Sequence, residues 1–307
     1  MNSRFESSRP TASVVIPYYN ESETLEELLK TIRQKHPQIE IIVVDDGSDR
    51  SPSTICDTYA ATLISHPYNK GNGAAIKTGC RSATGDCVIF MDADGQHDPR
   101  HIDGFIDKIA SGYDMVVGAR SSDSQATISR RIANALYNRI ASWITGHEIL
   151  DLTSGYRAVR KECLMPLLYL LPNRFSYPTT ITMAFFRSGY SVNYLDIQVN
   201  KRKDKSSHIK PVRDGLRFLI IIFRVGTLYS PLKVFVPISI IHFTIGLFYY
   251  GYTYITHGRF TNMGAALLIV SVLIFLIGLV SEQITNLLYS TTPATTRQHK
   301  TSADRSL

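Results

Sequence analysis

The chain has 307 residues and a formal net charge of +7, enough for one α/β domain of ordinary size with an appendage. Its positive charge is concentrated between Lys201 and Arg224, immediately before an almost entirely apolar region from Leu232 to Leu288. A basic cluster at a membrane boundary indicates anionic lipid headgroups or phosphate ligands, so we expect no nucleic acid partner.

Cysteine usage and the first residues both indicate a reducing compartment. The four cysteines are scattered, with no CxxC pair and no histidine at zinc spacing, so we expect reduced core residues. The first residues lack the apolar core of a signal peptide. We therefore expect the first domain to lie in the cytosol.

The first two thirds of the chain alternate apolar runs with amphipathic stretches. Strands are predicted over 12–17, 39–44, 62–65, 87–91 and 115–118, and helices over 23–35, 53–61, 73–83 and from about Pro99. This alternation predicts an α/β fold with a mostly parallel, Rossmann-like sheet covered on both faces. Ligands bind such sheets beyond the carboxyl ends of the strands. Polar and glycine-rich segments collect at those ends here, at 18–21, 45–48 and 92–94.

The last third predicts a transmembrane hairpin over 231–290. No Asp, Glu, Lys or Arg occurs in 234–255 or 263–281, and each run approaches the roughly 20 residues that cross a bilayer. We expect spans over about 234–255 and 263–284. Basic residues flank the hairpin on both sides and are sparse in its connector, so both chain ends should face the cytosol.

The segment between domain and hairpin predicts a helix that lies in the membrane interface, over 210–230. Lys210, Arg213, Arg217 and Arg224 fall on one stripe at helical spacing, with apolar residues around the rest. A core helix with solvated arginines would give the same stripe. The first domain then covers 1–209, and 291–307 is expected to be a disordered cytosolic tail.

The strongest chemical signal is the sequence Met91-Asp-Ala-Asp-Gly-Gln-His97 at the end of an apolar strand. Two carboxylates released into a turn can converge on a hard divalent cation, which prefers oxygen ligands and often bridges to phosphates. Asp94 and the Gln96 carbonyl are the expected direct ligands. Asp92 is expected to reach the metal through water, or to contact the ribose.

Two further segments suit a nucleotide. A carboxylate of Asp45 or Asp46 can accept hydrogen bonds from a base or a ribose, although Asp-Asp-Gly-Ser also suits an ordinary turn. The loop Asn69–Gly73 opens a helix and offers backbone amides to phosphate. It lacks the spacing of a P-loop and of GxGxxG, which disfavours ATPase and dinucleotide functions.

Taken in order, five motifs resemble the family 2 glycosyltransferases, and among these the dolichyl- and polyprenyl-phosphate sugar synthases. The motifs are Val15–Glu21, Val43–Ser48, Asn69–Gly73, Met91–His97 and Thr153–Arg157. The resemblance implies a GT-A fold, an inverting reaction, a nucleotide-sugar donor and Mg²⁺ or Mn²⁺. By position, the nucleotide would be held by Pro17, Tyr19, Glu21, Val44 and Asp46, with Lys70 and Ala93 in the same donor-binding set. Asp92, Asp94 and Gln96 would hold the diphosphate through the metal.

The resemblance also implies arginines for the acceptor phosphate: Arg120, Arg130 or Arg131, and Arg202. Beginning at this last arginine the family often reads R-x-x-G-x-S-K, whereas Lys205 and His208 replace the glycine and the final lysine here. Guanidinium groups match phosphate oxygens. A phosphate monoester is already anionic at neutral pH, so no strong base is needed. Asp151 could assist as a base, or could order the turn from Ser154 to Arg157.

The expected function is inverting transfer of a hexose, from a donor of the UDP-glucose or GDP-mannose type, to a polyprenyl or dolichyl phosphate at the membrane. A processive polysaccharide synthase usually carries a QxxRW motif, and the single tryptophan, Trp143, lies outside any such motif. The same motifs would also suit transfer to a non-phosphate lipid, or a non-catalytic membrane scaffold that binds a nucleotide. Packing of the spans could support a homo-oligomer.

Overall fold

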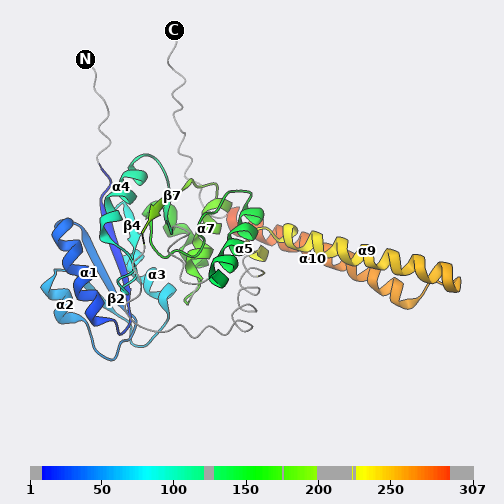
Figure 1. The fold of residues 1–307 in the computed structure, drawn as a ribbon, viewed down its shortest axis with the longest axis horizontal. Helices are drawn as coiled ribbons and strands as arrows, with labels where there is room; N and C mark the ends of the chain where they lie inside the picture. The colour runs from blue at the N-terminus through cyan, green and yellow to red at the C-terminus, as the bar shows by residue number, and fades with distance from the viewer. Residues whose placement is uncertain (1–8, 121–127, 175, 199–222, 224–225, 291–307) are drawn as a thin grey trace, which may run out of the picture.

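The computed structural model describes residues 9–120, 128–174, 176–198, 223 and 226–290, and shows an α/β domain from which a long helical hairpin projects (Figure 1). Arg202, Lys205, His208, most of the predicted interfacial helix and the predicted tail lie outside these residues. Within 210–230, helix is described at 223 and from Gly226 to Tyr229.

A seven-stranded sheet forms the centre of the described domain, in the order β3-β2-β1-β4-β6-β5-β7. The strands are β1 (Ala12–Tyr18), β2 (Glu40–Asp45), β3 (Thr62–Ser65), β4 (Cys87–Phe90), β5 (Met115–Arg120), β6 (Arg157–Arg160) and β7 (Val192–Ile197). β1 to β4 pair in parallel, β7 is parallel to β5, and β6 runs antiparallel between β4 and β5. The carboxyl ends of β1, β2, β4 and β5 therefore share one edge with the start of β6. The predicted mostly parallel sheet is confirmed.

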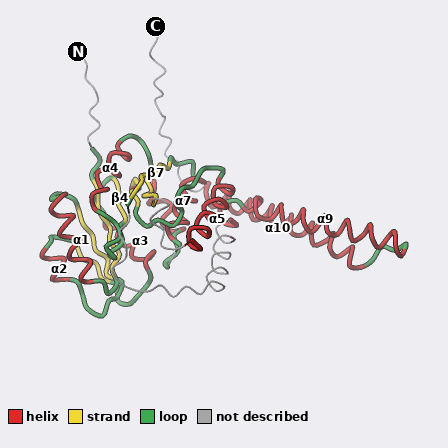
Figure 2. Tube along the Cα trace, viewed as in Figure 1, coloured by secondary structure: helices red, strands yellow, loops and turns green. Residues whose placement is uncertain are grey.

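Strand residues alternate between two cores because successive side chains point to opposite faces. Val14 and Ile16 of β1 belong to one core, and Val15 belongs to the other. Helices cover both faces, as Figure 2 shows for the domain. Helices α1 (Ser22–Lys35) and α4 (Ile102–Ala110) pack on the Val14 side; α3 (Asn72–Ser82), α5 (Ile128–Thr145) and α7 (Tyr177–Arg187) pack on the Val15 side.

Short elements complete the domain: α2 (Ser53–Thr58), α6 (Lys161–Leu164), and 3₁₀ turns η1 (Pro99–His101) and η3 (Met165–Leu170). Helix α2 ends three residues before the predicted 61, and Ala60 lies in the left-handed region at φ 50°, which a continuing helix cannot adopt. All four cysteines are buried and unbonded in these cores, as the sequence predicted.

The hairpin consists of α9 (Pro231–His257) and α10 (Asn262–Ser290), which contain the two predicted spans. Both are long and apolar enough to cross a membrane, and only a small part of each is buried within the molecule. At 1.5 Å per residue α9 is about 40 Å long, against about 30 Å of hydrocarbon. The two helices pack closely where Gly246 faces Leu267 and Leu268.

The base of the hairpin is fastened to the domain by polar contacts. Arg187 at the end of α7 pairs with Glu282 of α10 at 2.9 Å and donates to Asn286 at 2.7 Å. The buried Tyr229 hydroxyl donates to the Thr180 carbonyl oxygen of α7 at 2.9 Å. Lys233 of α9 donates to the Ile144 carbonyl oxygen at the end of α5 at 2.9 Å. Helices α5 and α7 thus connect the domain to the hairpin.

Candidate active site

Polar groups from four strand ends meet at the edge defined above. Asp46 follows β2 and is only 3% exposed. Its carboxylate bonds to His66 Nδ1 at 2.7 Å, and it accepts from the backbone N–H groups of Lys70 at 2.9 Å and Gly71 at 2.7 Å. Asp46 therefore fixes the loop that opens α3. Gly71 adopts φ +102°, which a residue with a side chain rarely takes.

The neighbouring residues of the predicted nucleotide set differ in exposure. Tyr19 is 47% exposed beyond β1. Val44 and Ala93 are buried at 0% and 2%, so their side chains contribute to the core rather than to an open surface. Pro17 is half-buried and pairs with Val44 across the sheet, and Glu21 directly precedes α1. Lys70 extends over the Tyr68 ring, 5.8 Å from its centroid.

The turn after β4 holds Asp92 and Asp94 close to the sheet. Asp94 Oδ1 accepts from the Gln96 N–H at 3.1 Å, and Gly95 between them adopts φ +72°. The Asp92 N–H donates to Nδ1 of the buried His97 at 3.1 Å, which places the imidazole proton on Nε2. Burial lowers the pKa of His97 to about 4, so this ring is neutral at physiological pH. The Tyr156 ring stacks on it at a centroid distance of 4.8 Å.

Asp92 and Asp94 suit a divalent cation whose remaining ligands come from a substrate. No group of three or more His, Cys, Asp or Glu side chains suited to a metal occurs among the described residues. Asp92 and Asp94 instead supply two carboxylates at one strand end. Mg²⁺ is commonly held by one or two carboxylates with substrate phosphates and water completing its shell. The donor set therefore matches a metal site that a phosphate ligand completes.

Arg120 and Asp151 form a bidentate pair at the end of β5. Arg120 Nε lies 2.7 Å from Asp151 Oδ2, and Nη2 lies 2.9 Å from Oδ1. Asp151 also accepts from the N–H groups of Thr153 and Ser154, both at 3.1 Å. Burial alone would raise the pKa of Asp151, but the bonds from Arg120 and the turn hold it below its usual value. Of its two expected roles, ordering the turn before β6 matches these contacts.

Two residues that the sequence reasoning gave no role lie against this site. Arg157 is fully buried and donates to the carbonyl oxygens of Ser154 and Pro178, which joins the turn to the start of α7. Tyr177, the first residue of α7, lies beside Asp92 across Gly155. Arg157 could have been found from the sequence, because it ends the predicted Thr153–Arg157 motif. The local sequence around Tyr177 contains no motif that indicates a functional residue.

The structure describes only part of the remaining predicted acceptor residues. Arg130 and Arg131 lie in the first turn of α5, which follows β5, and the structure describes their backbone but not their side chains. Arg202 lies outside the described residues. Their role in acceptor binding stays a prediction.

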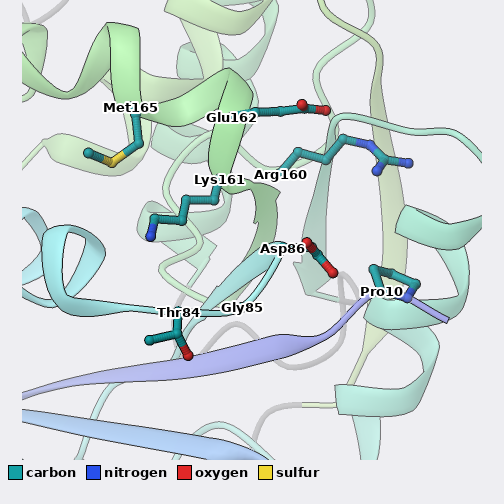
Figure 3. A pocket seen from close by; sticks show the side chains of 8 residues that line it. All are labelled: Pro10, Thr84, Gly85, Asp86, Arg160, Lys161, Glu162 and Met165. Carbon is teal, nitrogen blue, oxygen red and sulfur yellow. The ribbon is translucent and has the colours of Figure 1, made fainter. Parts of the chain in front are cut away.

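A separate pocket of about 500 Å³ lies at the opposite edge of the sheet, before β4 and after β6 (Figure 3). Its lining includes Asp86, Arg160, Lys161 and Glu162. These groups are used structurally: Asp86 accepts from Thr11 Oγ1 at 2.8 Å, and Arg160 Nε donates to the Tyr113 carbonyl oxygen at 3.1 Å. The carboxylates and loops of the candidate site are not part of it.

Residues 13–168 match the family model of glycosyl transferase family 2, and residues 230–287 match that of the GtrB C-terminal hairpin. The chain belongs to glycosyl transferase family 2. The first match contains nearly all of β1, the strands β2 to β6 and the Asp92–Asp94 turn, and the second contains nearly all of α9 and α10. The resemblance seen in the sequence motifs is confirmed, and the hairpin match supports a membrane protein.

Curated family 2 relatives include sugar transferases named for polyprenyl phosphates. An undecaprenyl-phosphate 4-deoxy-4-formamido-L-arabinose transferase of Pectobacterium carotovorum is 32% identical over 64% of this chain and 63% of its own length. The polyprenol monophosphomannose synthase of Mycolicibacterium smegmatis is 29% identical over 64% and 80%. Glycosyltransferase AglJ of Haloferax volcanii is 24% identical over 89% and 93%. The chain thus spans less than two thirds of the Pectobacterium relative, and about half of a Proteus mirabilis transferase of the same name.

Solved structures of the same fold include glucosyl-3-phosphoglycerate synthase from Mycobacterium tuberculosis. Its complex with Mn²⁺, UDP-glucose and phosphoglyceric acid superposes with a TM-score of 0.57 at 19% identity, covering 71% of this chain and 80% of that one. At this identity the likeness establishes the fold alone. It confirms the GT-A-like architecture expected for glycosyl transferase family 2.

Proposed function

We propose that this chain transfers a sugar, with inversion, from a nucleotide-sugar donor to a polyprenyl phosphate at a membrane surface. The observation that supports the proposal is one sheet edge at which the Asp92 and Asp94 carboxylates and the Arg120–Asp151 pair lie together. The carboxylates would serve a metal–diphosphate, and the arginine would serve a second phosphate. The apolar hairpin fastened to the same domain supports a lipid acceptor. The relatives named for undecaprenyl phosphate and polyprenol support the acceptor class.

The donor side of the reaction uses the ends of β1, β2 and β4. The loop that Asp46 fixes, together with the exposed Tyr19, would border the nucleoside, and Asp92, Asp94 and Gln96 would face its diphosphate. Bound Mg²⁺ or Mn²⁺ would neutralise charge on the departing nucleoside diphosphate. The solved relative binds UDP with Mn²⁺ or Mg²⁺, which supports this metal class.

The acceptor side would use the arginines near β5. Arg120 donates from Nε and Nη2 to Asp151 and Thr153, which orients the guanidinium, and Nη1 would donate to the acceptor phosphate. The acceptor's anionic phosphate oxygen forms a bond to the anomeric carbon as the bond from that carbon to the nucleoside diphosphate breaks. One displacement gives inversion. The protein's task is to align the two phosphates and offset their repulsion.

The paired state of Asp151 argues for a phosphate acceptor over a lipid hydroxyl. A hydroxyl nucleophile would need a base near neutral pKa. The Asp151 carboxylate is bound to a guanidinium and two backbone N–H groups, and its pKa is lowered, so it is poorly suited to accept a proton.

The test is transfer of radiolabelled sugar into an organic-extractable lipid. Full-length protein receives polyprenyl phosphate, Mn²⁺ or Mg²⁺, and UDP-glucose, UDP-N-acetylglucosamine or GDP-mannose in turn. We expect one donor to give an acid-labile lipid product that disappears with EDTA. Product with diacylglycerol alone would identify a non-phosphate acceptor, and nucleotide binding without any product would indicate a scaffold.

A further inference from the structure

The candidate site described above assigns no role to the hydroxyl of Tyr177. Tyr177 is 2% exposed, and its Oη has no hydrogen-bond partner in the part of the chain that the structure describes. Unsatisfied buried hydroxyls cost stability and are uncommon, so each one calls for an explanation. Tyr177 opens α7, directly beside the candidate metal site.

The position of this hydroxyl relative to Asp92 is set by Gly155. A Cβ at position 155 would lie 2.8 Å from Asp92 Oδ2 and 3.3 Å from Tyr177 Oη. The two oxygens therefore border the same small space, which exists because residue 155 has no side chain. Burial, together with the nearby Asp92, raises the pKa of Tyr177 well above its usual value, so the hydroxyl keeps its proton.

The backbone around this space is held by Arg157. Its Nε and Nη2 donate to the Ser154 carbonyl oxygen, and its Nη1 donates to the Pro178 carbonyl oxygen and Thr182 Oγ1, both at 2.9 Å. Gly155 and Tyr177 are each adjacent to a residue bound in this way. On the other side, His97 Nε2 lies 4.0 Å from Asp92 Oδ2. The Tyr177 hydroxyl and Asp92 Oδ2 therefore lie on two sides of the position that a Cβ of residue 155 would occupy.

We propose that Tyr177 is a positioning residue for Asp92. When donor and divalent cation bind, its hydroxyl donates a hydrogen bond to Asp92 Oδ2 across the space beside Gly155. This bond directs the other carboxylate oxygen toward the ligand. The inference rests on the proposed function, since it assigns Asp92 to the metal–donor complex. Groups that orient a ligating carboxylate typically change metal affinity or activity by about 10- to 100-fold.

The first variant is Tyr177→Phe in the full-length protein, which removes only the hydroxyl. We expect Mn²⁺ affinity in the presence of UDP or GDP, measured by titration calorimetry, to fall about 10-fold. We expect kcat to fall while KM for the lipid acceptor stays constant. The Tm should stay constant or rise, because a buried unpartnered hydroxyl is removed. Tyr289→Phe is the matched control: its hydroxyl is also buried, but it lies beside Tyr229 at the hairpin base, so Mn²⁺ affinity should not change.

The second variant, Gly155→Ala, fills the shared space. Its Cβ would approach Asp92 Oδ2 more closely than real Cβ contacts allow, so the carboxylate must move. We expect a similar loss of Mn²⁺ affinity, and no further loss when Tyr177→Phe is added, because both changes break one interaction.

Wild-type Mn²⁺ affinity and kcat in Tyr177→Phe, or losses that are fully additive with those of Gly155→Ala, would overturn the inference. Failure of the proposed function has a different signature. In that case the wild-type protein transfers no sugar from any donor, while the Mn²⁺ titrations still report on Tyr177.

Discussion

Asp92 and Asp94 stand one residue apart at the end of β4, yet their surroundings differ. Asp92 Oδ2 faces inward, toward Gly155 and His97, whereas Asp94 accepts from the Gln96 N–H within its own turn. The direct metal contact of Asp94, predicted from the sequence, stays a prediction, and we propose the more constrained orientation for Asp92.

Replacing Asp94 by asparagine tests that prediction. Asp94→Asn keeps the shape of the side chain and removes its charge, so sugar transfer should fall by at least about 100-fold, as expected for a direct ligand. Thermal stability should change little. Radiolabel transfer and Tm are the measurements, with Asp107→Asn as control, because Asp107 is exposed and pairs with Arg9 on the surface. Retained transfer in Asp94→Asn would remove Asp94 from the metal site.

Asp151→Asn separates the two roles considered for Asp151. Loss of the carboxylate leaves the largely buried Arg120 without its partner, so the free energy of unfolding should fall by about 3 kcal/mol. Transfer should fall with it, and the pH dependence of the remaining transfer should match that of the wild-type enzyme. Urea unfolding and pH–rate profiles are the measurements. Full stability combined with a lost acidic limb would instead identify Asp151 as a base.

Residues placed by the local strand pattern could be predicted from the sequence. Residues placed by contacts between distant parts of the chain were missed. The Asp92–Asp94 turn and Asp46 follow apolar strands, so their position at the sheet edge could be predicted from the alternation of strands and helices. The partner of Asp151 could not be chosen, because Arg120 lies 31 positions away in the sequence. Tyr177 owes its place to Gly155 and Arg157, and no periodicity connects those residues.

Among the elements, α7 contacts the candidate site at one end and the hairpin at the other. Its first residue borders the candidate metal site, and its last residue, Arg187, pairs with Glu282 of the hairpin. Both partners are mostly buried, at 28% and 17% exposure, so the pair is more than a solvated surface contact. The helix thus connects the candidate site to the base of the hairpin.

Breaking this pair should uncouple the anchor from the chemistry. In Arg187→Glu, we expect transfer to membrane-embedded polyprenyl phosphate to fall several-fold, with nucleotide affinity unchanged, because like charges repel at the hairpin base. Hydrogen exchange should increase in 282–289. The reversed pair, Arg187→Glu with Glu282→Arg, should restore both values toward wild type. Absence of rescue would show that the salt bridge does not carry the coupling.

The elements themselves were predicted unevenly. Strong apolar periodicity gave α1, α3 and both spans with boundaries close to those observed. The antiparallel strand β6 was not predicted, because Arg157 and Arg160 occupy both ends of its four residues and hide the apolar pattern. The contacts that fasten the hairpin depend on single polar residues within apolar helices, and local sequence does not reveal their partners.

At the scale of the whole molecule, the exposed surface of α9 and α10 requires an apolar environment. Large side chains such as Phe248 and Ile255 are 75% and 85% exposed along a hairpin that projects from the domain. Contiguous apolar surface of this extent indicates a membrane contact. We expect the protein to stay in the membrane pellet after alkaline carbonate washing and to be released by detergent. Release by carbonate alone would contradict a spanning hairpin.

Because the four native cysteines are buried, the native chain should react little with thiol-labelling reagents. Burial raises the pKa of Cys56 to about 11 and of Cys87 and Cys163 to about 12, and also raises that of Cys80, so few thiolates are available to react with maleimides. A single Arg259→Cys substitution in the exposed hairpin connector would then report on its own location, with no need to remove native thiols. If both chain ends face the cytosol as predicted, an impermeant maleimide should label this position in intact cells. A cysteine placed at the exposed Asp57 should react only after permeabilisation, and the opposite pattern would invert the topology.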